Sequence, residues 1–247
     1  MRNQKHTLVV AALVVFLLAL SAPGFAVAIS HASGSNHPIS GTHGYAPSKL
    51  SPIIYAQNPD FGGLYASQND TNGLGNFATT FDNFTLGANY NVDEFQWIGG
   101  YFNGSPSTIT AFTLNFYDDA AGAPGNLLAS YNGPGTFGET FIGTDSFGDP
   151  MYIYDGLLGT PFAASANTQY WVSIVPDLGF PPQWGWGTSV QGDGVGYQVF
   201  FGAGGQVQSD FAFALSGTQS AVPEPGSLVL LGTGLLGLAG VIRRKLF

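Results

Sequence analysis

Glycine and proline interrupt the chain so often between residues 53 and 217 that no ten-residue stretch there keeps helical spacing free of both. Large apolar residues instead alternate with polar ones, most clearly in Ala111–Tyr117. One face of that segment would carry Phe112, Leu114 and Phe116, and the other Thr113, Asn115 and Tyr117. A period of two is the pattern of a β-strand with one buried face, so this part of the chain is predicted to be all-β.

Several more segments show short apolar or alternating runs. The candidate strands are Phe81–Leu86, Phe95–Phe102, Leu127–Tyr131, Met151–Tyr154, Tyr170–Ile174, Gly196–Phe201 and Phe211–Leu215. Turn signals such as Ala123-Pro-Gly125 and Gly192-Asp-Gly194 separate them. Short strands with polar outer faces favour an antiparallel β-sandwich of jelly-roll type, with a barrel as the alternative. The 20 Phe, 11 Tyr and 4 Trp residues would supply its core.

Residues 1–28 have the organisation of a secretory signal peptide with a helical apolar segment. Arg2 and Lys5 give a positive start, Leu8 to Leu20 is apolar, and Ala26-Val27-Ala28 offers small residues for cleavage. An uncleaved membrane anchor is the alternative, although thirteen apolar residues are short for one. The mature chain would begin outside the cytoplasm.

Residues 29–52 are rich in Ser, Gly, His, Pro and Thr and show no hydrophobic periodicity, which predicts a flexible linker before a domain at residues 53–217. His31, His37 and His43 recur every six residues. That spacing matches neither a helical turn nor a zinc-finger pattern, so we interpret them as linker residues rather than metal ligands.

The last segment, residues 218–247, has three parts in a fixed order. Pro223-Glu224-Pro225 is followed by an uncharged run, Gly226 to Ile242, and then by Arg243, Arg244 and Lys245. As a helix, the run would measure about 25 Å, enough for a thin bilayer. Basic residues bias membrane topology toward the cytoplasm, so a transmembrane helix with a cytoplasmic end is predicted.

This three-part tail, residues 222–247, closely resembles the PEP-CTERM sorting signal of bacterial exported proteins. The resemblance implies that an exosortase, a membrane-embedded cysteine peptidase or transpeptidase, recognises and processes the tail. An ordinary C-terminal membrane anchor is the alternative.

The central domain also resembles the β-sandwich domains of bacterial surface proteins known as the choice-of-anchor type. The segments Trp97–Phe102, Tyr170–Ile174 and Trp184-Gly-Trp186 contribute to that resemblance. It implies an extracellular sandwich and transfers no catalytic residues.

Charge is distributed unevenly along the chain. Between residues 29 and 242 one lysine, Lys49, stands against all 15 acidic residues, a formal charge of −14. Such a field repels nucleic acid and anionic lipid, and it suits cations or a neutral polymer. The chain has no cysteine, so no disulfide supports the fold.

The predicted domain lacks the residues of most hydrolytic sites, because it has no His, Cys, Lys or Arg. Ser-His-Asp and Cys-His arrangements are therefore excluded within it, and we expect no enzyme. Paired carboxylates remain, since two facing carboxylates hydrolyse glycosides. The adjacent pairs Asp93-Glu94 and Asp118-Asp119 would point to opposite faces of a strand.

Carboxylates and loop carbonyls also bind calcium. The two candidate clusters are Asp145, Asp149 and Asp155, and Asp118, Asp119 and Asn126. Neither follows EF-hand spacing. A structural calcium is possible, its ligands are unknown from the sequence, and no other cofactor is expected.

The segment Gly179–Gly187 is a glycine-rich aromatic loop in this interpretation. Trp184 and Trp186 would share a face, and Gln183 and Asp193 would offer polar groups, so a glycan contact is one hypothesis. The other is that the tryptophans belong to the core.

These patterns together predict an exported surface or matrix protein that is anchored in the membrane before an exosortase processes it. The β-sandwich would serve adhesion or exopolysaccharide association. The alternative is a secreted carbohydrate-active hydrolase that uses paired carboxylates.

Overall fold

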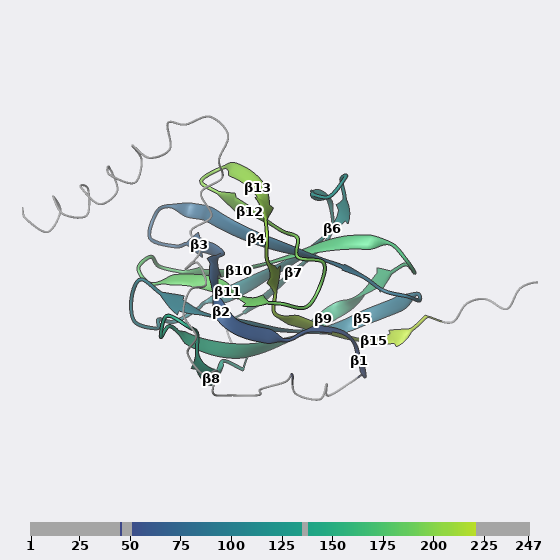
Figure 1. The fold of residues 1–247 in the computed structure, drawn as a ribbon, viewed down its shortest axis with the longest axis horizontal. Coiled ribbons are helices and arrows are strands. Elements are labelled where there is room, and N and C mark those ends of the chain that lie inside the picture. Colours follow the sequence, from purple (N-terminus) through teal and green to yellow (C-terminus); the bar gives the residue numbers. More distant parts are fainter. Residues whose placement is uncertain (1–44, 46–50, 135–137, 221–247) are drawn as a thin grey trace, which may run out of the picture.

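The computed structural model describes residue 45, residues 51–134 and residues 138–220. This part of the chain contains strands and no helix, as Figure 1 shows. The strands are β1 (Ile53–Gln57), β2 (Pro59–Ala66), β3 (Gln68–Asp70), β4 (Gly75–Thr85), β5 (Tyr90–Phe102), β6 (Ala111–Asp119), β7 (Pro124–Pro134), β8 (Thr140–Thr144), β9 (Pro150–Ala164), β10 (Gln169–Leu178), β11 (Gln183–Ser189), β12 (Gly196–Phe200), β13 (Ala203–Val207), β14 (Asp210–Phe211) and β15 (Phe213–Gln219).

The strands form two sheets. One has seven strands in the order β13-β12-β4-β3-β10-β6-β7. The other has eight, with the order β1-β15-β5-β11-β14, β2 on β11, β9 on β5 and β8 on β9. In Figure 1, β13, β12 and β4 lie in the upper part of the view and β1, β9, β15 and β8 in the lower. The all-β prediction is confirmed, and the two separate sheets agree with the sandwich rather than the barrel.

Pairing is antiparallel throughout the described strands, except between β3 and β10. Every strand predicted from alternation falls within or largely overlaps an observed one; Ala111–Tyr117, for example, lies inside β6. The predicted terminal helices, residues 1–28 and 226–242, lie outside the described residues.

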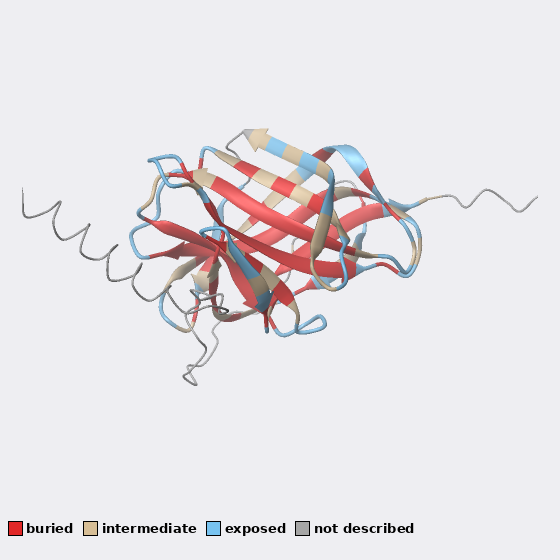
Figure 2. Ribbon diagram, turned by 90° about the horizontal axis from the view of Figure 1, so that it is seen from above, coloured by how far each residue is buried: buried red, intermediate tan, exposed pale blue. Residues whose placement is uncertain are grey.

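Aromatic rings fill the space between the sheets. Phe95 of β5 stacks on Phe213 of β15 with ring centroids 5.4 Å apart and an interplanar angle of 2°. Phe116 of β6 stacks on Phe162 of β9 at 4.3 Å. Large buried rings remove much apolar area from water and so stabilise a fold that has no disulfide. Figure 2 shows the strands buried along much of their length and the turns exposed.

Two residues of the predicted linker 29–52 contact the sandwich. The Tyr45 hydroxyl donates to the Gln57 carbonyl at 2.7 Å, and the Ser51 hydroxyl donates to the Asp93 carboxylate at 2.5 Å. The ordered contacts of the domain therefore begin upstream of residue 53.

Candidate functional site

Trp184 and Trp186 lie in β11, a strand inside the eight-stranded sheet, and both are 0% exposed. The Trp184 indole N–H donates to the Tyr154 hydroxyl at 3.3 Å, and that of Trp186 donates to the Ala212 carbonyl at 2.9 Å. A ring without exposed area cannot stack on a sugar. The glycan-contact hypothesis is therefore wrong for both tryptophans, and the core hypothesis holds.

The glycines around these tryptophans make room for protein, not for a ligand. A Cβ on Gly99 of β5 would lie 2.0 Å from a ring carbon of Trp184. A Cβ on Gly185 would lie 2.9 Å from Leu64 and Phe102 side-chain atoms. Residues 183–187 therefore form a strand whose two faces are packed, and the expected loop is replaced by β11.

The two polar partners of that hypothesis do not form a site with the tryptophans. Gln183 is buried, and its side-chain oxygen accepts from Asn103 Nδ2 at 3.3 Å. Asp193 is exposed in the turn after β11, where it accepts from Asn83 Nδ2 at 3.2 Å.

The carboxylate pairs are engaged in local structure. Asp118 accepts from the side chain of Asn126 at 3.0 Å, and Asp119 accepts from the Trp171 indole N–H at 2.8 Å. Asp145 accepts from the backbone N–H groups of Phe147 and Asp149, both at 2.9 Å. Within the described parts of the chain, no three His, Cys, Asp or Glu residues are grouped to hold a metal ion.

A first groove of about 520 Å³ lies between the two sheets, bordered by β7 and β9. The core residues Trp97, Phe112 and Leu114 form the bottom of this groove, and no carboxylate lines it. β7 ends the seven-stranded sheet, and Leu157 of β9 is 57% exposed beside the groove. Besides this apolar surface, the groove is lined by the polar side chains of Ser130, Asn132 and Thr160, and no charged residue lines it.

A second, open groove of about 410 Å³ crosses the outer face of the seven-stranded sheet. Its rings come from the two strands that flank β10. Phe81 of β4 pairs with Ser173 of β10, and Tyr117 of β6 pairs with Trp171, with its hydroxyl 3.3 Å from that of Ser173. The two ring centroids are 5.4 Å apart at 66°. Outside the groove lining, Tyr197 of β12 pairs with Phe81 and packs on its ring, with centroids 6.1 Å apart.

Amide and hydroxyl groups line the rest of this groove. Asn69 donates to the carboxylate of Asp177 at 2.8 Å. Thr79 donates to the side-chain oxygen of Asn76 at 3.1 Å. Asp177 is the one carboxylate in the groove lining. The described residues contain no Lys, Arg or His, so nothing in this part of the chain would attract an anionic ligand.

Asn115 lies on the groove side of β6, between Thr113 and Tyr117. Among the described residues, its side-chain oxygen is one of the few buried polar atoms that receive no hydrogen bond. That oxygen has almost no exposed area, so it is not itself a contact point for a ligand. The half-buried Asn115 amide as a whole still lines the groove and gives it a polar group.

Sequence alternation had already placed Thr113, Asn115 and Tyr117 on one face. It could not show that Phe81, Thr79 and Val199 join them, because β4, β10 and β12 meet β6 only through the folded register. The signal for this site that the sequence does contain is the row of polar and aromatic residues on the outer face of one strand.

A buried carboxyl lies on the opposite face of β4. Burial raises the pKa of Asp82 well above its usual value, and the charges of Asp210 and Asp193 act in the same direction. The N–H groups of Phe211 and Asn83, at 2.6 and 2.7 Å, oppose that shift without cancelling it. Burial also raises the pKa of Asp210.

These shifts predict that the domain loses stability as the pH rises above about 4. Between the ordinary value of 3.8 and the raised folded value, the folded state holds a proton on Asp82 that the unfolded state has released. The stability that this proton contributes to the folded state is lost as the pH rises through that window. Melting temperatures from pH 4 to 8 should fall for the wild type and fall less for Asp82→Asn. A wild-type melting temperature that rises across this range would contradict the assignment.

Comparison with known proteins gives one match. The PEP-CTERM protein-sorting motif matches residues 221–245, which include Pro223, Glu224, Pro225, Arg243, Arg244 and Lys245. Those residues lie outside the described part of the structure. No curated protein and no solved structure matches the chain, so the choice-of-anchor resemblance stays a prediction. Within residues 51–134 and 138–220, no helix is long and apolar enough to cross a membrane.

Proposed function

We propose that this chain is an exosortase-sorted surface or matrix protein whose β-sandwich binds an uncharged polysaccharide in the outer groove of the seven-stranded sheet. The PEP-CTERM match supports an exported protein that is membrane-anchored before processing. Polysaccharide binding goes beyond that match, and the observation that carries it is the Phe81–Tyr117 ring pair in a groove that is also lined by the amide of Asn115.

The chemistry of the groove favours this class of ligand. Aromatic faces pack on the apolar faces of sugar rings, while amides and hydroxyls exchange hydrogen bonds with sugar hydroxyls. The groove volume lies within the usual range for ligand sites. A polyanion would meet an acidic domain without a compensating cation in the described residues, which disfavours it.

Catalysis has no support in this geometry, and we propose a binding role without an enzyme activity. Glycoside hydrolysis needs two carboxylates across one site, roughly 5 to 9.5 Å apart. The groove between the sheets is lined by none, and the outer groove by Asp177 alone, which Asn69 holds.

Replacing Asn115 by Leu tests the site, because Leu has a similar volume and removes the amide from the groove lining. We expect the affinity of the purified mature protein for exopolysaccharide from its host to fall about tenfold, the effect of one good hydrogen bond. The melting temperature should stay unchanged or rise, since an unpaired buried acceptor is lost. Isothermal titration and thermal melting measure the two effects.

Asn91→Leu is the matched control, since Asn91 is exposed on β5 of the other sheet and should not affect binding. Equal affinities for the wild type and Asn115→Leu would refute the groove. Binding that responds only to a polycation and vanishes at high salt would instead assign the surface to a basic protein partner.

A further inference from the structure

β7 is the last strand at one end of the seven-stranded sheet, and its outer edge is open. Among the described strands it pairs with β6 and with no other. It has 11 residues, whereas β13 at the opposite end of the same sheet has 5. The backbone N–H and C=O groups along the outer edge of an end strand have no partner in the sheet, so they can pair with a further strand.

Natural end strands are usually protected against such pairing by charged side chains, by a proline within the strand or by bulges. β7 has a proline at each end, Pro124 and Pro134, and none between them. Its register with β6 shifts between Pro124 and Ala129 and is regular from Ala129 to Pro134. The second half of β7 therefore has a regular edge without a proline inside it.

This side of the domain also lacks charged residues in its sequence. Residues 120–138 and 156–176 contain no Asp, Glu, Lys, Arg or His, although residues 29–242 carry a formal charge of −14. The carboxylate of Asp118 lies at the start of β7, where Asn126 Nδ2 donates to it at 3.0 Å. Two copies of an acidic domain approach each other most easily where their surfaces carry no charge. The same lack of charge gives a basic partner no attraction to this strand.

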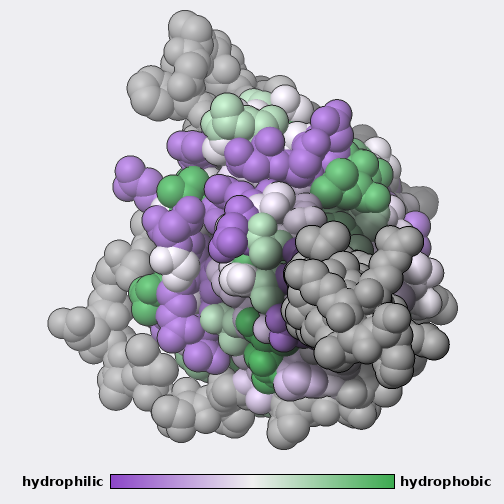
Figure 3. All heavy atoms as spheres, turned by 90° about the vertical axis from the view of Figure 1, so that its right-hand side faces the viewer, coloured by the Kyte–Doolittle hydropathy of each residue, from purple (hydrophilic) through white to green (hydrophobic). Residues whose placement is uncertain are grey.

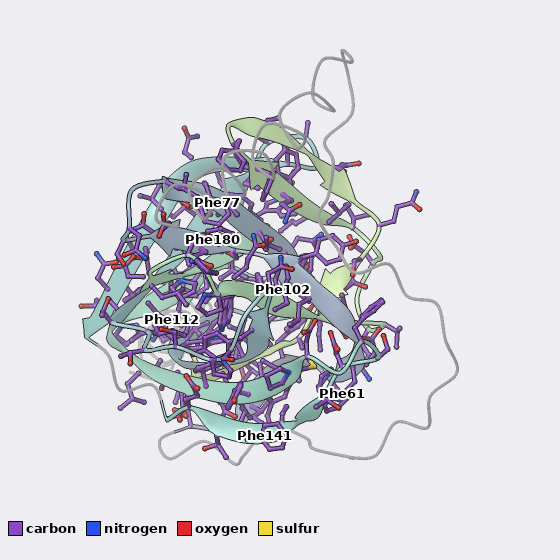
Figure 4. The ribbon with its side chains drawn as sticks, turned by 90° about the vertical axis from the view of Figure 1, so that its left-hand side faces the viewer. Phe61, Phe77, Phe102, Phe112, Phe141 and Phe180 are labelled. Carbon is purple, nitrogen blue, oxygen red and sulfur yellow. The ribbon has the colours of Figure 1, made fainter. Side chains whose placement is uncertain are left out.

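Apolar side chains are exposed along this side of the domain. Leu127 and Leu128 of β7 are 56% and 47% exposed, and Leu157 of β9 is 57% exposed. β7 and β9 border the groove between the sheets, and Phe112 at the bottom of that groove lies inside the domain in Figure 4. A strand added beside β7 would remove part of the exposed leucine area from water, which favours association.

We propose that β7 is a self-association surface, on which a second copy of this chain adds its own β7 in the antiparallel direction. Such an interface is isologous, because both copies contribute the same strand, and it closes with two-fold symmetry. It joins the two seven-stranded sheets into one and pairs the open backbone groups of both edges. The two-fold axis of an antiparallel pair is perpendicular to the sheet, so the outer grooves of both copies lie on the same face. This inference goes beyond polysaccharide binding and does not depend on it.

Replacing Leu127 and Leu128 together by Glu tests this surface, because both side chains are exposed and the new charges of the two copies would repel each other. In sedimentation equilibrium, the wild-type mature protein should form a dimer as its concentration rises. The dimer dissociation constant of Leu127→Glu/Leu128→Glu should be about tenfold higher or more, with an unchanged melting temperature of the monomer.

Leu74→Glu/Val190→Glu is the matched control, since it adds the same charge at two exposed residues in the turns before β4 and after β11. Hydrogen exchange of the wild type gives a second measurement, which does not depend on how the variants fold. The β7 amides that are not bonded to β6 should exchange more slowly in the dimer than in the monomer.

A wild type that stays monomeric at every concentration would overturn the inference. A dimer that the β7 variant weakens no more than the control does would also overturn it, because the contact would then lie elsewhere. Slow exchange of the β7 amides in a monomer would show that another segment of the chain covers this edge. Protection that appears only with exopolysaccharide would assign the edge to that ligand, and either result contradicts self-association through β7.

Discussion

Changing Pro223, Glu224 and Pro225 to alanine is expected to leave the full-length chain in the membrane of a host that has an exosortase. Proline fixes φ and removes a backbone donor, so the sequence predicts an extended segment that an enzyme could bind. Alanine favours helix and would continue the apolar run that follows. The wild type should instead appear as a shorter form without its tail.

Immunoblots of membrane and culture-medium fractions measure the outcome, with antibody against the sandwich. Alanines at Thr218, Gln219 and Ser220 give the matched control, because these three residues precede the motif. That control should be processed as the wild type is. Normal processing of the Pro223–Pro225 variant would show that the motif is not what the enzyme recognises.

Replacing Gly99 by Ala is expected to destabilise the domain by about 3 kcal/mol or more. The new Cβ would lie 2.0 Å from a ring carbon of Trp184, which is fully buried, and 2.7 Å from the Gly185 carbonyl oxygen, which belongs to the paired strand β11. Overpacking of this kind costs about 1 to 3 kcal/mol and sometimes more. For a domain of this size that loss lowers the melting temperature by roughly 6 to 12 °C.

Gly159→Ala is the control, because a Cβ there would meet no atom within 4 Å. Trp184→Ala should cost about 3 to 5 kcal/mol, the usual value for a large ring removed from a core. Thermal and chemical unfolding measure all three variants. A Gly99→Ala protein as stable as the wild type would show that Trp184 does not pack against β5.

Strands with a clean alternation of apolar and polar residues could be predicted from the sequence, as Ala111–Tyr117 in β6 illustrates. β11 could not, because Gln-Trp-Gly-Trp-Gly-Thr-Ser has the composition of a loop. Its glycines face the neighbouring strands so closely that side chains are excluded. A sequence does not distinguish glycine that permits a turn from glycine that permits close packing.

The candidate site, too, could be predicted from the sequence only in part. The row Thr113, Asn115 and Tyr117 follows from local periodicity, whereas the ring pair needs the register that brings β4 beside β10. Solvent-facing residues on the right-hand end of the domain show no comparable grouping: Figure 3 shows hydrophilic residues there with hydrophobic ones scattered among them. Scattered apolar residues are normal on a protein surface and do not mark a site.

Mass spectrometry of the mature protein, purified from a host with an exosortase, tests whether the enzyme removes the tail. The peptides should cover the sandwich through Ser220 and end near Pro223-Glu224-Pro225, with residues 228–247 absent. Recovery of a C-terminal peptide that ends at Phe247 would contradict it, and the tail would then be an ordinary membrane anchor.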